Sequence, residues 1–143
     1  MATYLEQARG GDFPPPPIAR TLGFALESVE RGRATFRMET DPARHGNPMG
    51  TVHGGVLCDL ADAAMGMAFA STLEEGESFT TVELKVNFLR PVWRATLTAV
   101  AEVLQRGRTV GLVECRVTDG EGRAVAHATS TCLTLRGAQA DGR

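Results

Sequence analysis

The hydrophobic pattern of this chain changes from strand-like to helix-like and then back to strand-like. Apolar and polar residues alternate at every second position over 34–38 and again over 82–88, which is the period of a half-buried strand. Between these segments, from Gly55 to about Leu73, apolar residues leave little of a helix circumference polar. A helix that is apolar nearly all round is surrounded by other parts of a protein. We therefore expect one long, enclosed helix.

Turn-forming residues separate further extended segments from one another. These segments are 24–29, 96–104, 109–117 and 124–135. One central helix, with one or two strands before it and four antiparallel strands after it, is an α+β layout in which a curved sheet wraps the helix. Such a sheet leaves an edge strand with which a second copy of the chain can pair.

The two ends of the chain lie outside this pattern. Residues 1–20 are predicted to form a Pro-rich and helical N-terminal extension. Its run 14–17 favours an extended, polyproline-like spacer, because proline donates no backbone hydrogen bond. We place a single folded domain over 21–136 and a disordered polar tail over 137–143.

Composition narrows the classes of function. The 143 residues include 15 basic and 17 acidic ones, mixed along the chain, so no surface for nucleic acid or for an anionic membrane is indicated. The first residues lack the basic and apolar regions of a signal peptide, and the longest apolar run is too short to span a bilayer. Three widely spaced cysteines match neither a disulfide framework nor a zinc knuckle. We expect a cytoplasmic protein.

The candidate chemistry begins where the loop 47–55 enters the long helix. A helix N-terminus offers unpaired N–H groups and partial positive charge, and Gly54 and Gly55 let a carbonyl oxygen approach that backbone closely. A donor aimed at a developing oxyanion is worth roughly 10²–10³ in rate. This pattern favours an oxyanion hole, and the alternative is that the two glycines only permit tight packing.

Asp62 is an acid in a segment that otherwise looks buried. Because a buried carboxylate is costly unless it is paired, it is seldom accidental. Asp62 is predicted to attack a carbonyl as a nucleophile or to activate water as a general base. The alternative is that it faces a polar gap and bonds to backbone or to a neighbouring chain. Asp59 is the competing carboxylate, nearer the exposed first turn.

The spacing of these two features predicts a site shared between subunits. Asp62 follows Gly54 by eight residues, roughly 12 Å along a helix axis. A catalytic group must approach the reacting atom to about 3–3.5 Å. One helix therefore cannot hold a carbonyl at its first amide and attack it with its own Asp62. Unless Asp62 is irrelevant, it serves the helix N-terminus of another subunit, with two sites per dimer.

Neighbouring polar residues have more than one interpretation. We expect the His53 ring to bond to backbone and fix the loop, with a general base as the alternative. Asn47 either orients a water or the carboxylate or makes an ordinary turn before proline. His45 and His127 have no ligand-spaced partners, so no metal is expected. Cys58 is interpreted as core packing. The chain has no Gly-x-Ser-x-Gly, phosphate-binding or dinucleotide motif.

Three motifs, in order, resemble the hot-dog fold and within it the PaaI-like (phenylacetate-pathway-type) acyl-CoA thioesterases. They are Asn-x-x-Gly-x-x-His-Gly-Gly at 47–55, Leu-Ala-Asp-x-Ala at 60–64, and the segment 81–91, and the likeness covers about 22–135. The resemblance implies a curved antiparallel sheet wrapped around one central helix. It also implies hydrolysis of an acyl-CoA to free acid and CoA without a further cofactor, by homodimers with shared sites that assemble as dimers of dimers.

The resemblance further implies roles for particular residues. The catalytic acid of the family falls on Asp62, its oxyanion amide on Gly54, and its orienting residues on Asn47 and His53. The polar residue beside the carboxylate falls on Thr81 of the same chain as Asp62.

Substrate contacts are expected from Gly55 and Asn87, and CoA phosphates are expected to meet Arg90, Arg106 or Arg108. An ordinary solvated charged face is the alternative for these arginines. An aromatic acyl group, such as phenylacetyl, and an aliphatic one both stay open. So do two other functions, since fold alone does not decide function. They are a 3-hydroxyacyl-thioester dehydratase, whose Asp-x-x-x-x-His pattern is missing here, and a non-catalytic acyl-CoA-binding module.

Overall fold

Two strands precede the long helix and four follow it in the structure, a computed structural model that describes residues 4–11 and 14–142. The elements are α1 (Tyr4–Arg9), α2 (Pro17–Leu22), β1 (Phe24–Glu30), β2 (Arg33–Glu39), α3 (Pro42–His45), α4 (Gly54–Ala70), β3 (Glu77–Phe88), β4 (Thr96–Arg106), β5 (Val110–Thr118), β6 (Ala124–Arg136) and the 3₁₀ helix η1 (Gly137–Gln139).

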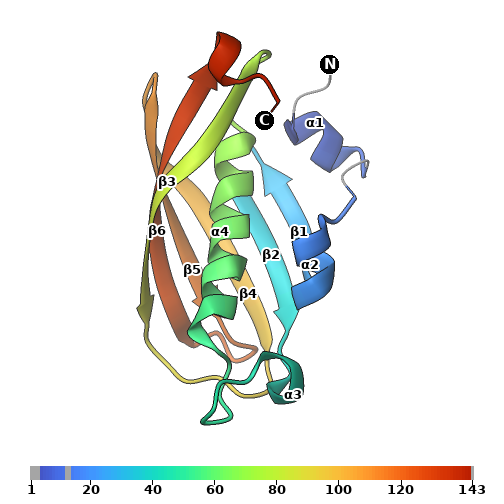
Figure 1. The fold of residues 1–143 in the computed structure, drawn as a ribbon. Coiled ribbons are helices and arrows are strands. Elements are labelled where there is room, and N and C mark those ends of the chain that lie inside the picture. The colour runs from blue at the N-terminus through green and yellow to red at the C-terminus, as the bar shows by residue number, and fades with distance from the viewer. Residues whose placement is uncertain (1–3, 12–13, 143) are drawn as a thin grey trace.

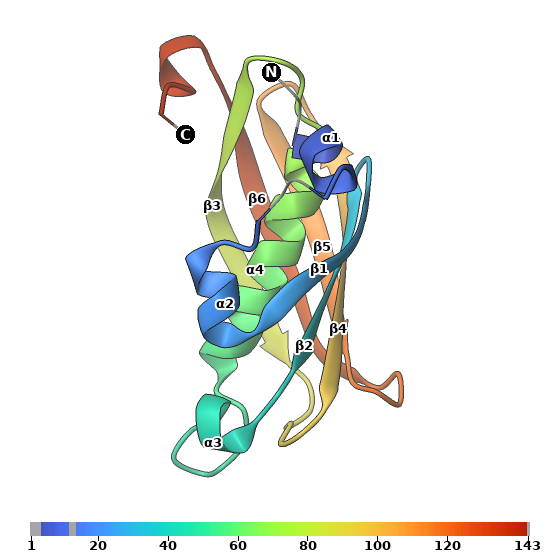
Figure 2. The ribbon, with the colours of Figure 1, turned by 90° about the vertical axis from the view of Figure 1, so that its right-hand side faces the viewer.

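The strands form one antiparallel sheet in the order β1-β2-β4-β5-β6-β3, and α4 crosses its concave face (Figures 1 and 2). The helix packs mainly on β4, β2 and β5 in the middle of the sheet. The predicted α+β layout, with a curved sheet around one long helix, is confirmed. Both edges of the sheet are strands that pair on one side only, β1 with β2 and β3 with β6.

The core forms because α4 presents large side chains to small ones on the sheet. Leu60, Met65 and Phe69 are completely buried, and the strands beneath them contribute residues such as Ala99. Phe69 also has the Arg106 guanidinium 4.9 Å above its ring centroid, and its ring lies so close to Gly111 that a β-carbon there would overlap it. Glycine is therefore required in β5 by a close approach of the helix.

One face of α4 is not covered by the sheet, and on this point the sequence prediction was wrong. Asp59 and Asp62 are exposed, while Cys58, Ala63 and Gly66 are only partly buried. The sheet covers the opposite side of the helix, so this face lies open between β3 on one side and α2 with β1 on the other. Asp62, which the sequence places in a buried segment, is consequently accessible in the isolated protomer.

The N-terminal extension, for which helix is predicted, contains α1 and α2, whereas the loop after β2 and the tail contain short helices that the hydrophobic pattern did not reveal. Pro16 has the extended conformation expected of the proline run, but Pro17 already begins α2, at the position where proline is best tolerated. In the segment predicted as a loop, the Asp41 side chain accepts the Ala43 N–H and starts α3. The tail predicted to be disordered contains η1. The start of α3 is thus set by a side-chain cap and that of α2 by proline, neither of which appears in a hydrophobic period.

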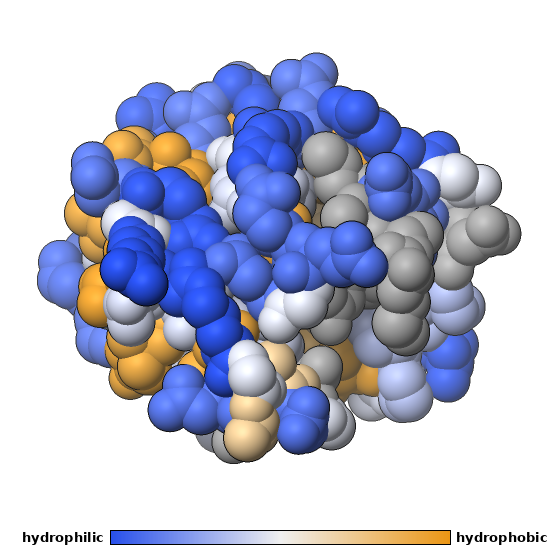
Figure 3. Space-filling model, turned by 90° about the horizontal axis from the view of Figure 1, so that it is seen from above, coloured by the Kyte–Doolittle hydropathy of each residue, from blue (hydrophilic) through white to orange (hydrophobic). Residues whose placement is uncertain are grey.

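The surface of the described residues is mainly hydrophilic at the end where α4 terminates (Figure 3). Exposed apolar side chains also occur in several strands, and β3 contributes Val82, which is 53% exposed, and Phe88, which is 56% exposed. The free edge that the sequence predicts is thus present at β3 and carries apolar side chains. None of the helices in residues 4–11 and 14–142 has the length and hydropathy needed to cross a bilayer.

The close approach of Phe69 to Gly111 can be tested by adding one methyl group. Gly111→Ala is expected to lower the free energy of unfolding by roughly 1–3 kcal/mol, because the buried ring has no room to move away. Gly120→Ala is the matched control, since a β-carbon there would meet no atom within 4 Å. Urea unfolding measures both variants, and equal stability of the two would contradict this account of the core.

Candidate active site

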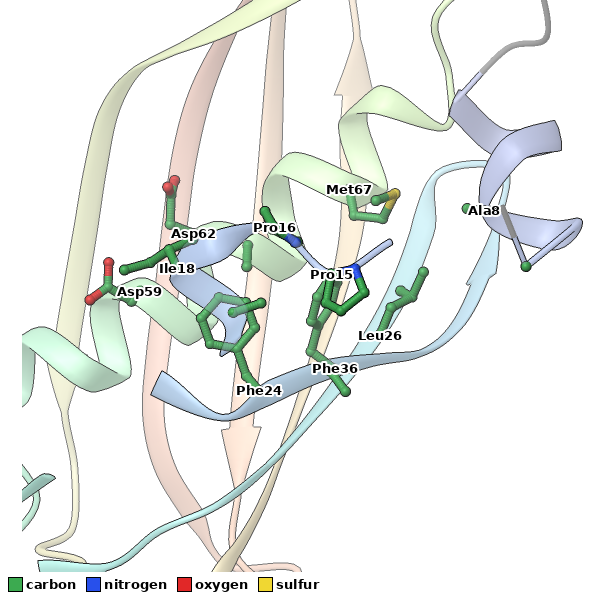
Figure 4. A pocket seen from close by; sticks show the side chains of 14 residues that line it. Ala8, Pro15, Pro16, Ile18, Phe24, Leu26, Phe36, Asp59, Asp62 and Met67 are labelled. Carbon is green, nitrogen blue, oxygen red and sulfur yellow. The ribbon is translucent and has the colours of Figure 1, made fainter. Parts of the chain in front are cut away.

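Two hollows meet at the open face of α4, and both are lined by Asp59 and Asp62. The first is an apolar cavity of about 480 Å³ between α4, β1, β2 and the N-terminal segment, shown in Figure 4. The second is a shallow hollow between α4 and β3 that also includes Cys58 and Thr81. The two carboxylates therefore stand at the junction of an apolar cavity and an open surface.

The carboxylate of Asp62 has no hydrogen-bond donor among the described residues. Although the residue remains accessible, partial burial of its carboxyl group in this apolar setting raises its pKa, and the negative charge of Asp59 raises that pKa further. A structural carboxylate is ordinarily paired, so an unpaired one with a raised pKa in a hollow is a candidate functional group. The sequence left open that Asp62 bonds to backbone, and no such bond within its own chain is present among the described residues.

Thr81 is brought to the same hollow by an irregularity in β3. The register shifts between Thr81 and Glu83 opposite β6, so Val82 is an extra, bulged residue. Thr81 pairs with the buried Cys132, toward whose sulfur its hydroxyl lies at 3.8 Å. Bulges re-aim side chains and occur frequently beside active sites. The structure thus brings together Asp62 and Thr81 from one chain, as the resemblance implies.

The start of α4 leaves one backbone amide without an acceptor among the described residues. His53 is the N-cap residue, and its Nδ1 accepts the Gly55 N–H at 2.9 Å. The His53 ring is therefore bonded to backbone, as the sequence predicts for its structural role, and the Gly55 amide is occupied. The Gly54 N–H has no acceptor within the part of the chain that the structure describes, and a β-carbon at Gly54 would lie 2.9 Å from the Phe88 ring. The free donor is consequently at Gly54.

Asn47 holds the loop that leads to this helix. Its Oδ1 accepts the N–H groups of Met49 at 2.9 Å and Thr51 at 3.2 Å, while its Nδ2 donates to the Thr51 hydroxyl at 2.8 Å. These bonds are the turn chemistry that was one of its two interpretations. They fix the loop that leads to α4.

His45 is a positioning residue that the sequence analysis missed. It is buried, its Nδ1 accepts the Asp41 N–H at 3.0 Å, and its Nε2 lies 2.8 Å from the Leu22 carbonyl. Because Nδ1 accepts a backbone N–H, the neutral ring carries its proton on Nε2 and donates it to Leu22. Its own carbonyl accepts the His53 N–H at 2.8 Å. His45 thus ties the end of α2 to the loop that starts α4, a role without a sequence motif.

The residues predicted to bind substrate are not gathered in one place within the protomer. Asn87 is exposed, accepts a hydrogen bond from Lys85 at 3.0 Å, and lies on the sheet face opposite to that of its neighbour Phe88. Arg90 follows β3 near the start of α4. Arg106 and Arg108 lie near the C-terminal end of α4.

Arg106 is already engaged within the protomer, donating to Glu77 at 3.1 Å and to the Thr72 hydroxyl at 3.0 Å. These contacts place its charge at the C-terminal end of α4, where a cation is favourable to the helix dipole.

The cysteine on α4 differs from its expected role. Cys58 is only partly buried and lines the hollow beside β3, so its interpretation as core packing was wrong. Burial and the charges of Asp59 and Asp62 raise the pKa of its thiol, which keeps it protonated and unsuited to nucleophilic attack. Within the described ranges, no three His, Cys, Asp or Glu side chains are arranged to hold a metal ion.

Comparison with known proteins gives consistent results. Residues 49–126 match the family model of the Thioesterase superfamily. The 1,4-dihydroxy-2-naphthoyl-CoA hydrolase of Listeria monocytogenes is 31% identical over 71% of this chain and 82% of its own. The medium/long-chain acyl-CoA thioesterase YigI of Escherichia coli K12 is 30% identical over 82% of this chain and 84% of its own.

A solved structure extends the likeness to the fold. The E. coli PaaI protein from the phenylacetic acid degradation operon superimposes with a TM-score of 0.84 at 26% identity, over 94% of this chain and 95% of that one. The family model covers more than half of the sequence, and the sheet and helix are those of the hot-dog fold. The chain therefore belongs to the hot-dog thioesterase superfamily, and by homology it is a thioester hydrolase of the PaaI-like type.

Proposed function

We propose that the protein is an acyl-CoA thioesterase in which Asp62 is the catalytic carboxylate. The observation that carries the proposal is an unpaired carboxylate with a raised pKa, standing beside Thr81 at the mouth of an apolar cavity. A fatty or aromatic acyl group fits such a cavity, and its thioester carbon would then lie near the carboxylate. The names of the two curated relatives, both of which act on acyl-CoA substrates, support this substrate class.

The proposed site is shared between two subunits. The Gly54 amide and Asp62 belong to one straight helix and are separated by roughly 12 Å along its axis, so they cannot act on the same carbonyl. The free edge of β3, with its exposed Val82 and Phe88, is a surface on which a second copy can pair and bury apolar area. Pairing there would bring the Gly54 amide of one protomer toward Asp62 of its partner.

In the proposed reaction the Gly54 N–H donates to the thioester oxygen as that oxygen becomes negative. Asp62 either attacks the thioester carbon to form an acyl anhydride, which water then hydrolyses, or removes a proton from the attacking water. In both cases the C–S bond breaks, CoA leaves as a thiolate that takes up a proton, and the acyl group leaves as a carboxylate. The role proposed for the Thr81 hydroxyl is to orient the carboxylate or the water.

Loss of the charge on Asp62 is expected to abolish turnover. Asp62→Asn should lower the rate of thiol release from acyl-CoAs about 10²–10⁴-fold, because the amide is neither a base nor a nucleophile. Since the side chain is accessible, the variant should keep its thermal stability. Glu75→Gln, in an exposed turn, is the charge-matched control and should match wild type. If wild type binds acyl-CoAs but releases no thiol, a binding module or a dehydratase replaces this proposal.

The donor at Gly54 can be tested with two variants, of which only one keeps the backbone N–H. Gly54→Ala adds a β-carbon and keeps the N–H, whereas Gly54→Pro adds a β-carbon within its ring and replaces the N–H by the bond that closes the ring. Proline is tolerated at the first helical position, and His53, at φ −63° and ψ 135°, already has a conformation suited to precede it. We expect the proline variant to be roughly 10²–10³-fold slower than the alanine variant in kcat. Equal rates would exclude this amide as the donor.

Mixing these defects tests the shared site. In a heterodimer of Asp62→Asn and Gly54→Pro subunits, one site carries both defects and the other carries neither. Random mixing should therefore restore about a quarter of wild-type activity if the site is shared across a twofold axis. Absence of any recovery in mixed dimers, verified by differential tagging, would place both groups in one chain.

Activity should fall on acidification through a pKa that Asp59 helps to set. Asp62 must be ionised to act, and its pKa is raised by burial and by the charge of Asp59. Asp59→Asn removes the second cause, so the acid limb of the kcat/KM profile is expected to move to lower pH. Glu75→Gln should leave the limb in place. A limb that does not move in Asp59→Asn would assign it to another group.

A further inference from the structure

The apolar cavity at Asp62 is closed by a part of the chain that the family model does not cover. The family model matches residues 49–126, whereas one wall of the cavity is built from α1, the proline run and α2. Ala8, Pro15, Pro16 and Ile18 come from this N-terminal arm, as we call residues 4–11 and 14–22. In Figure 4 they face Phe24, Leu26 and Phe36 of the sheet across the cavity.

The part of the arm that contains α2 is anchored rather than resting loosely on the surface. Ala19 is buried in the core, and the Arg20 guanidinium donates back to the Pro15 carbonyl at 2.6 Å. At the end of α2, Arg44 donates to the carbonyls of Arg20 and Thr21, and His45 donates to the carbonyl of Leu22. These bonds satisfy carbonyls that a helix end leaves free. They also fix the arm to the loop that starts α4.

The cavity has one charged end and one apolar end. Asp59 and Asp62 are the only charged groups among its described lining residues, and they lie near Ile18 and Phe24. Toward the far end the lining is Leu26, Met67 and Ala8. Met67 lies five residues after Asp62 on α4, roughly 7.5 Å along the axis. The cavity is thus elongated, and at its far end the side chains of the described lining residues offer no partner for a polar group.

The volume sets the size of the group that fits. If each methylene occupies about the share of one liquid water, roughly 30 Å³, then 480 Å³ accommodates at most about sixteen carbons. A phenylacetyl group, with eight carbons, would fill only about half of this space on the same measure. A longer aliphatic chain fills it better, and filling matters because empty apolar space forfeits contacts.

Resting on the proposed function, we infer that the cavity is an acyl pocket for medium-length, unbranched acyl groups. The N-terminal arm limits the length of the acyl chain that this pocket accepts. The thioester carbon lies at Asp62, and the alkyl chain runs along α4 between the arm and β1. Its end meets Ala8 and Leu26, which set the longest chain that is accepted.

Binding of non-hydrolysable S-alkyl-CoA thioethers tests the pocket without depending on catalysis. In wild type the affinity should rise about fourfold per methylene from S-butyl to S-dodecyl, the factor that corresponds to about 0.8 kcal/mol per buried CH₂. It should rise no further at S-octadecyl, which exceeds the volume limit. Calorimetry measures the dissociation constants. An affinity independent of chain length would overturn the inference.

Variants at the far end separate the arm from the rest of the site. Ala8→Trp should weaken S-dodecyl-CoA at least tenfold and leave S-butyl-CoA unchanged, whereas Arg9→Trp, on the same helix but outside the cavity, should alter neither. Leu26→Ala lengthens the cavity and should strengthen S-octadecyl-CoA. If the dissociation constants of both cavity variants depended on alkyl length as those of wild type do, the role of the arm in limiting chain length would be refuted. Chain-length-dependent binding without thiol release would instead refute the proposed function and leave the pocket standing.

Discussion

The packing of α4 on the concave face of the sheet is the contact on which the rest of the structure depends. Completely buried side chains such as Leu60 and Phe69 fasten the helix to the middle strands. The sheet reaches round only one side of it, so the opposite side remains open with Asp59 and Asp62 upon it. The same packing that stabilises the fold therefore decides which face of the helix is available for chemistry.

The open face joins two environments that acyl transfer uses together. On one side lies an apolar cavity, and on the other Thr81 of the bulged β3 lines the same hollow as the carboxylate. Partial burial and the neighbouring Asp59 raise the pKa of Asp62, which costs stability but makes the ionised carboxylate more basic. In the proposed reaction the cavity excludes water from the acyl chain, and the free Gly54 amide is supplied by a second copy that pairs along the free β3 edge.

Backbone hydrogen bonds connect the parts of the site that lie far apart in the sequence. His45 donates to the end of α2 and accepts, through its own carbonyl, the N–H of His53. His53 in turn caps α4 with its ring. The wall of the apolar cavity and the start of the central helix are thereby held by one buried imidazole. A displacement of either would have to break a hydrogen bond of the His45 ring, which is partly shielded from water.

The sequence alone determined the succession of strands and helix along the chain, because the periods of two and of 3.6 residues are properties of local geometry. It also singled out Asp62, Gly54 and His53, since an acid and two glycines interrupt an apolar pattern. It placed Asp62 in a buried segment because composition does not reveal which side of a helix a sheet covers. Only the tertiary structure decided that this face is open, that the His53 ring occupies the Gly55 amide, and that His45 joins two elements. Those features depend on contacts between residues distant in the chain, and no local pattern records them.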